Sequence, residues 1–132
     1  MASLSKKVIN TQSAPSPVGP YEQAIRAGDW LYCSGQIALD PISGDMVGAG
    51  DIEEETKQVL KNLLAVLNAG GANSSNVIKT TIFLVNLNDF NKVNKIYSEV
   101  FKDKVSPARA CVEVSALPKG GLVEIDCIAW LG

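Results

Sequence analysis

The sequence predicts an α+β domain in which two helices cover one face of a mixed sheet. Apolar residues recur at helical spacing in two segments, while β-branched or alternating runs lie before, between and after them. The resulting order of strands, helix, strand, helix and two strands is typical of α+β folds. The chain of 132 residues has room for one domain, 1–132, which is large enough to bury a real core.

Composition limits the class of protein and its partners. Hydrophobic residues make up 46% and charged residues 20%, and the apolar run Leu63–Leu67 is far shorter than the roughly 20 residues that span a membrane. With 12 basic and 14 acidic residues the net charge is −2, so nucleic acid is an unfavoured partner. The three separated cysteines form no C-x-x-C pair, which predicts a reduced, cytoplasmic protein.

The N-terminal part predicts an edge strand, a loop and a hairpin. The edge strand is short and lies around Val8–Ile9. Three prolines between residues 13 and 20 exclude regular structure there and indicate an ordered loop. Residues 24–26 and 30–37 are expected to pair as strands, joined by a turn in which Gly28 supplies the special backbone angles.

The first helix has clear signals at both ends. Asp51 is placed to cap it, and Glu53–Glu55 lie in its electropositive first turn. A turn-rich loop at 40–45 precedes the helix, and Gly70–Gly71 ends it. Its expected apolar face consists of Ile52, Val59, Leu60, Leu63, Leu64 and Leu67.

A strand and the second helix follow. Residues 77–85 form a β-branched run, which predicts a central strand covered on both faces. Asn88 or Asp89 is expected to cap the second helix, which Ser106–Pro107 ends. The apolar residues at helical spacing are Phe90, Val93, Ile96, Tyr97, Val100 and Phe101.

Two closing strands, 108–114 and 122–130, alternate between two faces. The side chains expected to face the helices are Ala110, Val112 and Val114 in the first strand, and Val123, Ile125, Cys127 and Ala129 in the second. The opposite set comprises Arg109, Cys111 and Glu113, then Glu124, Asp126, Ile128 and Trp130. Because Trp30 and Tyr32 lie near this mixed, uncovered face, we expect a homo-oligomer whose sheet faces meet.

The residue types present narrow the chemistry. The chain has no histidine, which excludes Ser-His-Asp and Cys-His catalysis and histidine-containing zinc sites, and no metal is expected. Gly48–Gly50 lacks the third glycine and the G-K-[ST] sequence of phosphate-binding loops, and it is interpreted as the turn that leads into the first helix. Arg109 remains a candidate ligand for a carboxylate, since its forked donors match two oxygens. Pairing of Arg109 with Glu113, Glu124 or Asp126 across an interface explains it equally well.

Several segments together carry a resemblance to a known family. They are Gly19–Ala24 (GPYEQA), Tyr32–Ile37 (YCSGQI), Val77–Phe83 (VIKTTIF), Leu87–Phe90 (LNDF), Pro107–Val114 (PARACVEV), Leu117–Gly120 (LPKG) and Val123–Ile125 (VEI). Over its whole length the chain resembles the RidA family, also called the YjgF family. The resemblance implies a chorismate-mutase-like (ferredoxin-like) fold, a homotrimer whose sheets form a central barrel, and three sites in clefts between subunits.

The resemblance also implies an enzyme. Similar members are 2-iminobutanoate/2-iminopropanoate deaminases, which hydrolyse reactive enamines and imines released by pyridoxal-phosphate enzymes to 2-keto acids and ammonia. By motif position, Arg109 would hold the substrate carboxylate, and Glu124 would position or activate the attacking water. A protonated imine is already an electrophile, so orientation and a water can suffice without a cofactor.

Five further positions follow from the same motifs, each with a structural alternative. Tyr21 would line the cleft or plug the sheet edge. Ser34 and Gly35 would offer a hydroxyl and a backbone donor to the ligand, or form a bulge that needs glycine. Asn88 would contact the ligand or cap a helix, and Cys111 would line the site through its backbone or fill space as a small apolar residue. Cys33 and Cys127 are expected in the core.

The chain departs from the family pattern at two positions, and two other functions stay open. Ser106 stands where many relatives have an aromatic residue, and Glu22 where serine is common, which puts substrate preference in doubt more than the reaction. One alternative is a non-catalytic metabolite-binding or chaperone-like trimer. The other is a ribonuclease or translation inhibitor, against which the acidic charge, the two arginines and the absence of histidine argue.

Overall fold

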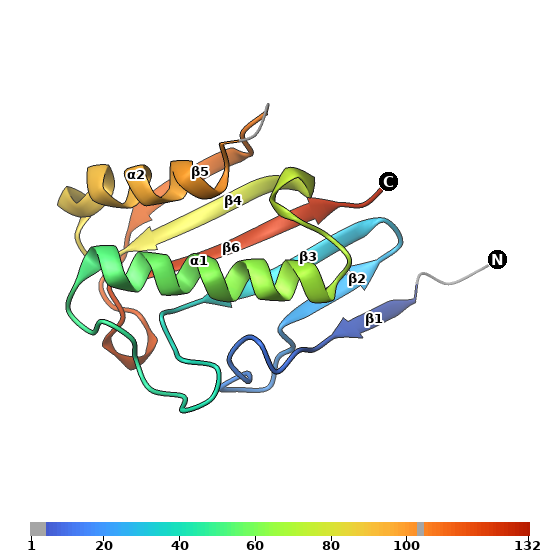
Figure 1. Ribbon diagram of the computed structural model, residues 1–132, viewed down its shortest axis with the longest axis horizontal. Helices are drawn as coiled ribbons and strands as arrows, with labels where there is room; N and C mark the ends of the chain where they lie inside the picture. Colours follow the sequence, from blue (N-terminus) through green and yellow to red (C-terminus); the bar gives the residue numbers. More distant parts are fainter. Residues whose placement is uncertain (1–4, 103–104) are drawn as a thin grey trace.

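The computed structural model describes residues 5–102 and 105–132. One six-stranded sheet, in the order β1-β2-β3-β6-β4-β5, carries two helices on one face (Figure 1). In chain order the elements are β1 (Lys6–Ile9), β2 (Ala24–Ala27), β3 (Trp30–Gln36), α1 (Ile52–Ala69), β4 (Val77–Leu84), α2 (Phe90–Val100), β5 (Ala108–Glu113) and β6 (Val123–Trp130). The β4–β5 pair is parallel and the other pairs are antiparallel, so the predicted α+β class with a mixed sheet is confirmed.

The N-terminal predictions are confirmed. β1 is an edge strand paired with β2, and β2 turns into β3 through Gly28, whose φ of 61° lies in the region that favours glycine. Between β1 and β2, residues 10–23 form the loop that the prolines predict. This loop borders a pocket that Glu124 also lines.

Helix α1 begins and ends as predicted. The Asp51 carboxylate accepts hydrogen bonds from the amides of Glu53 (3.0 Å) and Glu54 (3.2 Å), and the helix ends at Ala69, just before Gly70. Of the predicted apolar face, Leu64 is only half-buried and the other residues are buried. The helix therefore buries one stripe against the sheet.

Strand β4 differs from its prediction. It lies between β6 and the edge strand β5, so it is an interior strand but not a central one. Its fully buried side chains are Val77, Thr80, Ile82 and Leu84, while Thr81 and Phe83 on the other side are only half-buried. Only one face of the sheet is covered by helices, which is why the expectation of two covered faces is wrong for a single chain.

The start of α2 also differs. Asn88 lies within a short 3-10 helix, Leu87–Asp89, and its amide donates to the side chain of Asn86 at 3.0 Å. Asp89 takes the cap position of α2 with helical backbone angles and makes no side-chain capping bond there. The predicted capping role of Asn88 is therefore wrong, since Asn86 begins this turn two residues earlier.

The two faces of β5 are reversed relative to the prediction. Arg109 pairs in register with Thr80, and Cys111 with Ile82, and both partners are buried under the helices. Arg109 and Cys111 therefore lie on the helix-covered face, and Val112 on the open face. Alternation indicates which side chains share a face, but apolar character alone does not reveal which face the helices cover. For β6 the predicted buried set, Val123, Ile125, Cys127 and Ala129, is confirmed.

The open face of the sheet is rich in exposed apolar side chains. A register row crosses four strands through Val8, Ile25, Tyr32 and Ile128. Beside it, the rings of Trp30 and Trp130 lie with centroids 6.4 Å apart. Val8, Tyr32, Val112 and both tryptophans are each more than two-fifths exposed. An apolar surface of this breadth is typical of an interface between proteins.

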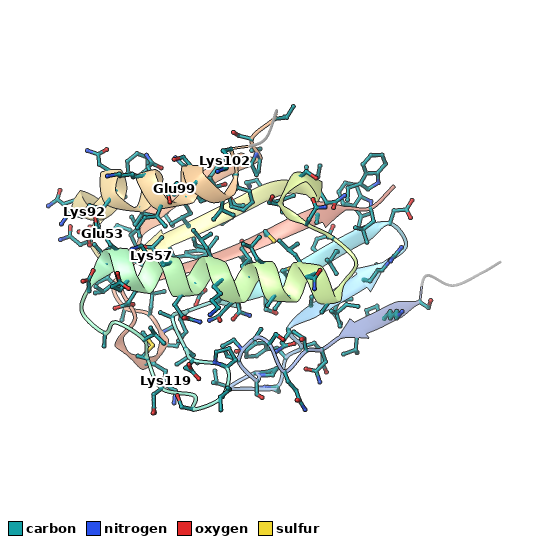
Figure 2. All side chains as sticks on the ribbon, in the orientation of Figure 1. Glu53, Lys57, Lys92, Glu99, Lys102 and Lys119 are labelled. Carbon is teal, nitrogen blue, oxygen red and sulfur yellow. The ribbon has the colours of Figure 1, made fainter. Side chains whose placement is uncertain are left out.

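The helical side has the opposite character. The charged side chains labelled in Figure 2 on and beside the helices, Glu53, Lys57, Lys92, Glu99 and Lys102, are all exposed. The helices thus present a charged surface and the sheet an apolar one. Among residues 5–102 and 105–132, no helix is both long and apolar enough to cross a membrane.

Candidate functional site

Glu124 lies on the open face, next to the backbone of Gly35. It alternates with the buried Val123 and Ile125 on β6, while a bulge in β3 between Cys33 and Gln36 brings Gly35 beside it. A β-carbon at Gly35 would lie 2.6 Å from Glu124 Oε2, far inside van der Waals contact. Glycine at this position is therefore what allows the carboxylate to approach the β3 backbone.

A small pocket with a cavity volume of about 40 Å³ adjoins these two residues. Its other lining residues are Pro15, Ser16, Pro17, Val18, Tyr21, Gln23, Gln36, Ile37, Leu39 and Pro118. Most of them are apolar, so the Glu124 carboxylate is the one ionisable group of this lining besides the Tyr21 phenol. The Tyr21 hydroxyl accepts a hydrogen bond from the amide of Val18 at 3.2 Å, which joins this ring to the wall.

Ser34 anchors the bulge from the other side. Its hydroxyl donates to the carbonyl of Glu22 at 2.6 Å, and its amide donates to the carbonyl of Gln23 at 2.9 Å. The hydroxyl proton is thus engaged within the chain. Ser34 can offer a ligand the lone pairs of its oxygen, which accept but do not donate.

Burial changes the acidity of Glu124. Desolvation raises the pKa of Glu124 above its ordinary value, and the charge of Asp126, two residues along the same face, raises it further. Burial likewise raises the pKa of Asp126, against hydrogen bonds from Thr81. A carboxylate with a raised pKa at the edge of an apolar pocket is a better proton acceptor than an ordinary one.

Arg109 is held on the opposite face by α2. Its Nη1 donates to Asn94 Oδ1 at 2.6 Å, and the guanidinium carbon lies 5.4 Å from the centre of the Phe90 ring and 5.0 Å from that of Tyr97. Tyr97 is itself fixed, because its hydroxyl lies 2.7 Å from Thr80 Oγ1 in the core. The exposed guanidinium keeps other N–H donors for a ligand, since Arg carries five in all.

An open groove of about 500 Å³ adjoins Arg109. It is lined by Asn94, Tyr97, Ser98, Ser106, Pro107 and Arg109. Glu113 is one of the carboxylates predicted as partners of Arg109. Its side chain instead accepts a hydrogen bond from the amide of Leu87 at 2.9 Å and so holds the turn before α2.

The cysteines are weakly reactive where they lie. Burial raises the pKa of the Cys111 thiol, although the nearby Arg109 charge opposes the shift, so this thiol stays protonated near neutral pH. Cys33 and Cys127 face each other across β3 and β6 in the core, as predicted. A hydrogen bond with Cys33, together with burial, raises the pKa of Cys127.

Asn94 is a residue that sequence reasoning missed. It lies on the face of α2 between Phe90 and Tyr97, the two rings that contact Arg109. Asn88, predicted from its motif, lies in the turn before the helix instead. The helical spacing of Phe90, Asn94 and Tyr97 indicates that the three side chains share one face of the helix. That Asn94 contacts Arg109 could not be predicted from this spacing, because it depends on which face of β5 meets α2.

The predicted site residues fall into two groups on one chain. Tyr21, Ser34, Gly35 and Glu124 lie around the small pocket, while Arg109 and Cys111 lie beside α2. Arg109 is paired in register with Thr80 of β4, and Glu124 with Phe83 of the same strand. Thr80 and Phe83 are three residues apart, so their side chains lie on opposite faces of the sheet, roughly 10 Å apart along the strand. A site that uses both residues therefore draws them from two copies of the chain.

Within the part of the chain that the structure describes, no group of three or more histidine, cysteine or acidic side chains is placed to hold a metal ion. The ionisable side chains that line the two pockets are Tyr21 and Glu124 in the small pocket, and Tyr97 and Arg109 in the open groove.

Known proteins resemble this chain along almost its whole length. The family model described as Endoribonuclease L-PSP matches residues 11–131. A human protein named 2-iminobutanoate/2-iminopropanoate deaminase is 48% identical over 132 residues, covering all of this chain and 95% of that protein. A RutC family protein from Synechocystis is 53% identical over 128 residues, covering 97% of this chain and 98% of that protein.

Solved structures agree with the sequence relatives. A protein of the conserved Rid family from Yersinia pestis superposes with a TM-score of 0.92 at 53% identity, covering 96% of this chain and 99% of that one. E. coli TdcF, solved with bound serine, superposes with a TM-score of 0.90 at 36% identity, covering 96% of this chain and 99% of that one.

Proposed function

The chain belongs to the RidA family, and from this premise we propose that it is a 2-iminobutanoate/2-iminopropanoate deaminase. The observation that carries the proposal is the Glu124 carboxylate, whose pKa is raised by burial, at the edge of a small apolar pocket. The full-length relationship to the human deaminase supports the same reaction.

The proposed reaction is hydrolysis of the carbon–nitrogen double bond of a 2-imino acid. Glu124 takes one proton from a water molecule as the water oxygen bonds to the imine carbon. The protonated Glu124 then returns this proton to the nitrogen of the tetrahedral adduct. The carbon–nitrogen bond breaks as the adduct's hydroxyl gives its proton to Glu124, which releases ammonia and leaves a 2-keto acid; Glu124 finally loses the proton to solvent. A protonated imine is already electrophilic, so a positioned water and one base suffice and no cofactor is required.

Arg109 is proposed as the clamp for the substrate carboxylate. Asn94 occupies one guanidinium N–H, and the remaining donors can meet both carboxylate oxygens. Cys111, which is beside Arg109 on the same face of β5, would line this part of the site. Because Arg109 and Glu124 lie on opposite faces of one chain, the clamp is supplied by a neighbouring copy.

For the oligomer we propose a homotrimer, which is the assembly that the family resemblance implies. Its three open sheet faces would meet in a central barrel, which would bury the exposed apolar row and the two tryptophans. Each of the three clefts between subunits would then combine Glu124 of one copy with Arg109 of the next. The described cysteines are all free, which suits the reducing cytoplasm that the sequence predicts.

A second candidate is a metabolite-binding trimer without turnover. The observation that favours it is the serine bound in the related TdcF structure, since serine carries a carboxylate that a guanidinium could hold. This alternative keeps the Arg109 clamp but gives Glu124 no chemical step.

The deciding experiment is a trapping assay. An amino-acid oxidase generates 2-iminopropanoate from alanine, and semicarbazide traps the imine that has not been hydrolysed. A slower formation of the semicarbazone therefore measures hydrolysis by the parent, Arg109→Ala and Glu124→Gln. The deaminase proposal requires acceleration by the parent and its loss in both variants. A folded parent that binds pyruvate without accelerating hydrolysis would establish the binding protein instead.

A further inference from the structure

Gln23 is a buried polar residue that the proposed reaction does not use. It immediately precedes β2, and its side chain is 2% exposed. An amide with little access to water must find its hydrogen-bond partners within the protein. Its partners therefore reveal which part of the chain depends on it.

All of these partners lie in the backbone of one loop. Gln23 Oε1 accepts from the amide of Thr11 at 2.7 Å, and Nε2 lies 3.0 Å from the carbonyl of Thr11. The same nitrogen lies 3.3 Å from the carbonyl of Ala14 and 2.8 Å from that of Pro15. One side chain thus joins the backbone at three positions over five residues.

The loop has few other means of being held. Pro15, Pro17 and Pro20 have no backbone N–H, so this segment cannot be fixed by the regular ladder of a strand. Two of the three carbonyls that the Gln23 amide binds belong to buried residues, Ala14 and Pro15, which water does not reach easily. The amide therefore replaces the solvent that these carbonyls have lost.

This loop is also one wall of the Glu124 pocket. Pro15–Val18 line the pocket together with Gly35 and Glu124. The backbone carbonyl of Gln23 accepts the amide of Ser34, next to Gly35, at 2.9 Å. Gln23 thus joins the wall on one side of the pocket to the bulge that carries the other side.

We propose that Gln23 is a positioning residue that fixes the Pro15–Val18 wall at a set distance from Glu124 and thereby limits the size of the substrate side chain. This inference rests on the proposed deaminase function, because the limit applies to the side chain of a 2-imino acid. A narrow, rigid pocket excludes larger side chains, whereas a loosened wall admits them.

Two variants of nearly the same size separate positioning from simple space filling. Gln23→Met keeps the length of the side chain and removes its hydrogen bonds. Gln23→Glu keeps the shape but turns a charged oxygen toward the carbonyls of Thr11, Ala14 and Pro15. If Gln23 positions the wall by hydrogen bonds, Gln23→Glu should alter selectivity and amide exchange more than Gln23→Met does. If Gln23 only fills space, the two variants should have equal effects on both. Gln12→Met makes the same chemical change at an exposed side chain of the same loop and serves as the control.

The kinetic readout is selectivity between small and large imines, made by the oxidase from alanine and from leucine. For the small imine, kcat/KM of Gln23→Met should fall about 10- to 100-fold, mainly through a higher KM, because the wall contacts the side chain and not the reacting atoms. The preference for the small imine over the large one should shrink. Unchanged selectivity, or equal effects of Met and Glu at this position, would overturn the inference.

The structural readout does not depend on activity. Amide hydrogen exchange over residues 11–18 should become faster in Gln23→Met than in the parent and Gln12→Met, while exchange in α1 stays the same. If the parent proves to be inactive, the deaminase proposal fails and this exchange measurement still decides whether Gln23 holds the wall. Unchanged exchange over residues 11–18 in Gln23→Met would show that it does not.

Discussion

Arg109 and Glu124 lie on opposite faces of the same sheet. Arg109 is paired in register with Thr80, whose side chain is buried under α2, and Glu124 is paired with Phe83 on the open face. The two residues for which we propose complementary roles, a clamp for a carboxylate and a base for water, are thus kept apart within one chain. Under the proposed deaminase reaction, which needs both residues, a contact between two copies of the chain would complete each site.

Asn94 is predicted to position the Arg109 guanidinium. Asn94→Ala removes the 2.6 Å hydrogen bond and leaves the guanidinium its contacts with the rings of Phe90 and Tyr97. We expect KM for 2-iminopropanoate to rise roughly tenfold, the size of one lost hydrogen bond to a charged group. Steady-state kinetics check this, with Asn91→Ala as an exposed control on the same helix. Equal kinetics for Asn94→Ala and Asn91→Ala would contradict the role.

Gly35→Ala should disable the base without unfolding the protein. The new β-carbon would lie 2.6 Å from Glu124 Oε2, so the carboxylate must move away from the β3 backbone. A displacement of about 1 Å can cost 100-fold in rate, and we expect kcat to fall on that scale. The control is Gly28→Asn, in the hairpin turn, where added atoms meet open space and asparagine tolerates the positive φ. Parental kcat in Gly35→Ala would refute the close approach.

Replacing Glu124 should stabilise the protein while it abolishes turnover. Burial, with the added charge of Asp126, raises the pKa of Glu124 in the folded protein, so between the unfolded and folded pKa values the folded state binds more protons. Stability therefore falls as the pH rises through this window, and the loss is complete above the folded pKa. Glu124→Gln carries no such charge.

The measurement is thermal unfolding of the parent and Glu124→Gln across pH. The variant should melt at a higher temperature near pH 7, and its advantage should shrink as the pH falls toward the ordinary glutamate value. Activity of the parent should decline on the acid side at a pH above that ordinary value, as Glu124 gains its proton. A variant that melts below the parent at neutral pH would contradict the sign of the pKa shift.

A lysine on the open sheet face should dissociate the assembly. Val112 is 43% exposed in the single chain and lies on this face, so Val112→Lys would bury a charge between subunits. Sedimentation should show a monomer, and turnover should vanish because the sites are shared. Ile42→Lys places the same charge on a loop residue that is 95% exposed and should leave both properties unchanged. A Val112→Lys protein that sediments with the parent would exclude this face from the interface.

Local features of the sequence were sufficient to predict much of the fold. The Asp51 cap depends on amides two and three residues away, and the Gly28 hairpin on its own backbone angles, so neither needs distant information. The prediction of the buried side chains of β6 was correct for a similar reason, because the apolar side chains of this strand are also the buried ones.

Features that depend on contacts distant in sequence could not be predicted in the same way. Val112 is apolar, as core residues are, but in the single chain it is exposed on the open face of the sheet. For this reason the prediction reversed the two faces of β5. The role of Asn94 required knowing that α2 packs over Arg109. The four bonds of Gln23 join it to a loop eight to twelve residues away, and nothing in the local pattern distinguishes this glutamine from Gln12.

The most direct test of the shared site is complementation between two inactive variants. Arg109→Ala and Glu124→Gln are mixed, their subunits are exchanged by mild unfolding and refolding, and mixed trimers are confirmed by native mass spectrometry. If each site takes Glu124 from one copy and Arg109 from the next, random mixing should restore about a quarter of the parental activity. Mixed trimers that stay inactive, although the parent treated in the same way recovers its activity, would show that the site does not combine these two residues across subunits.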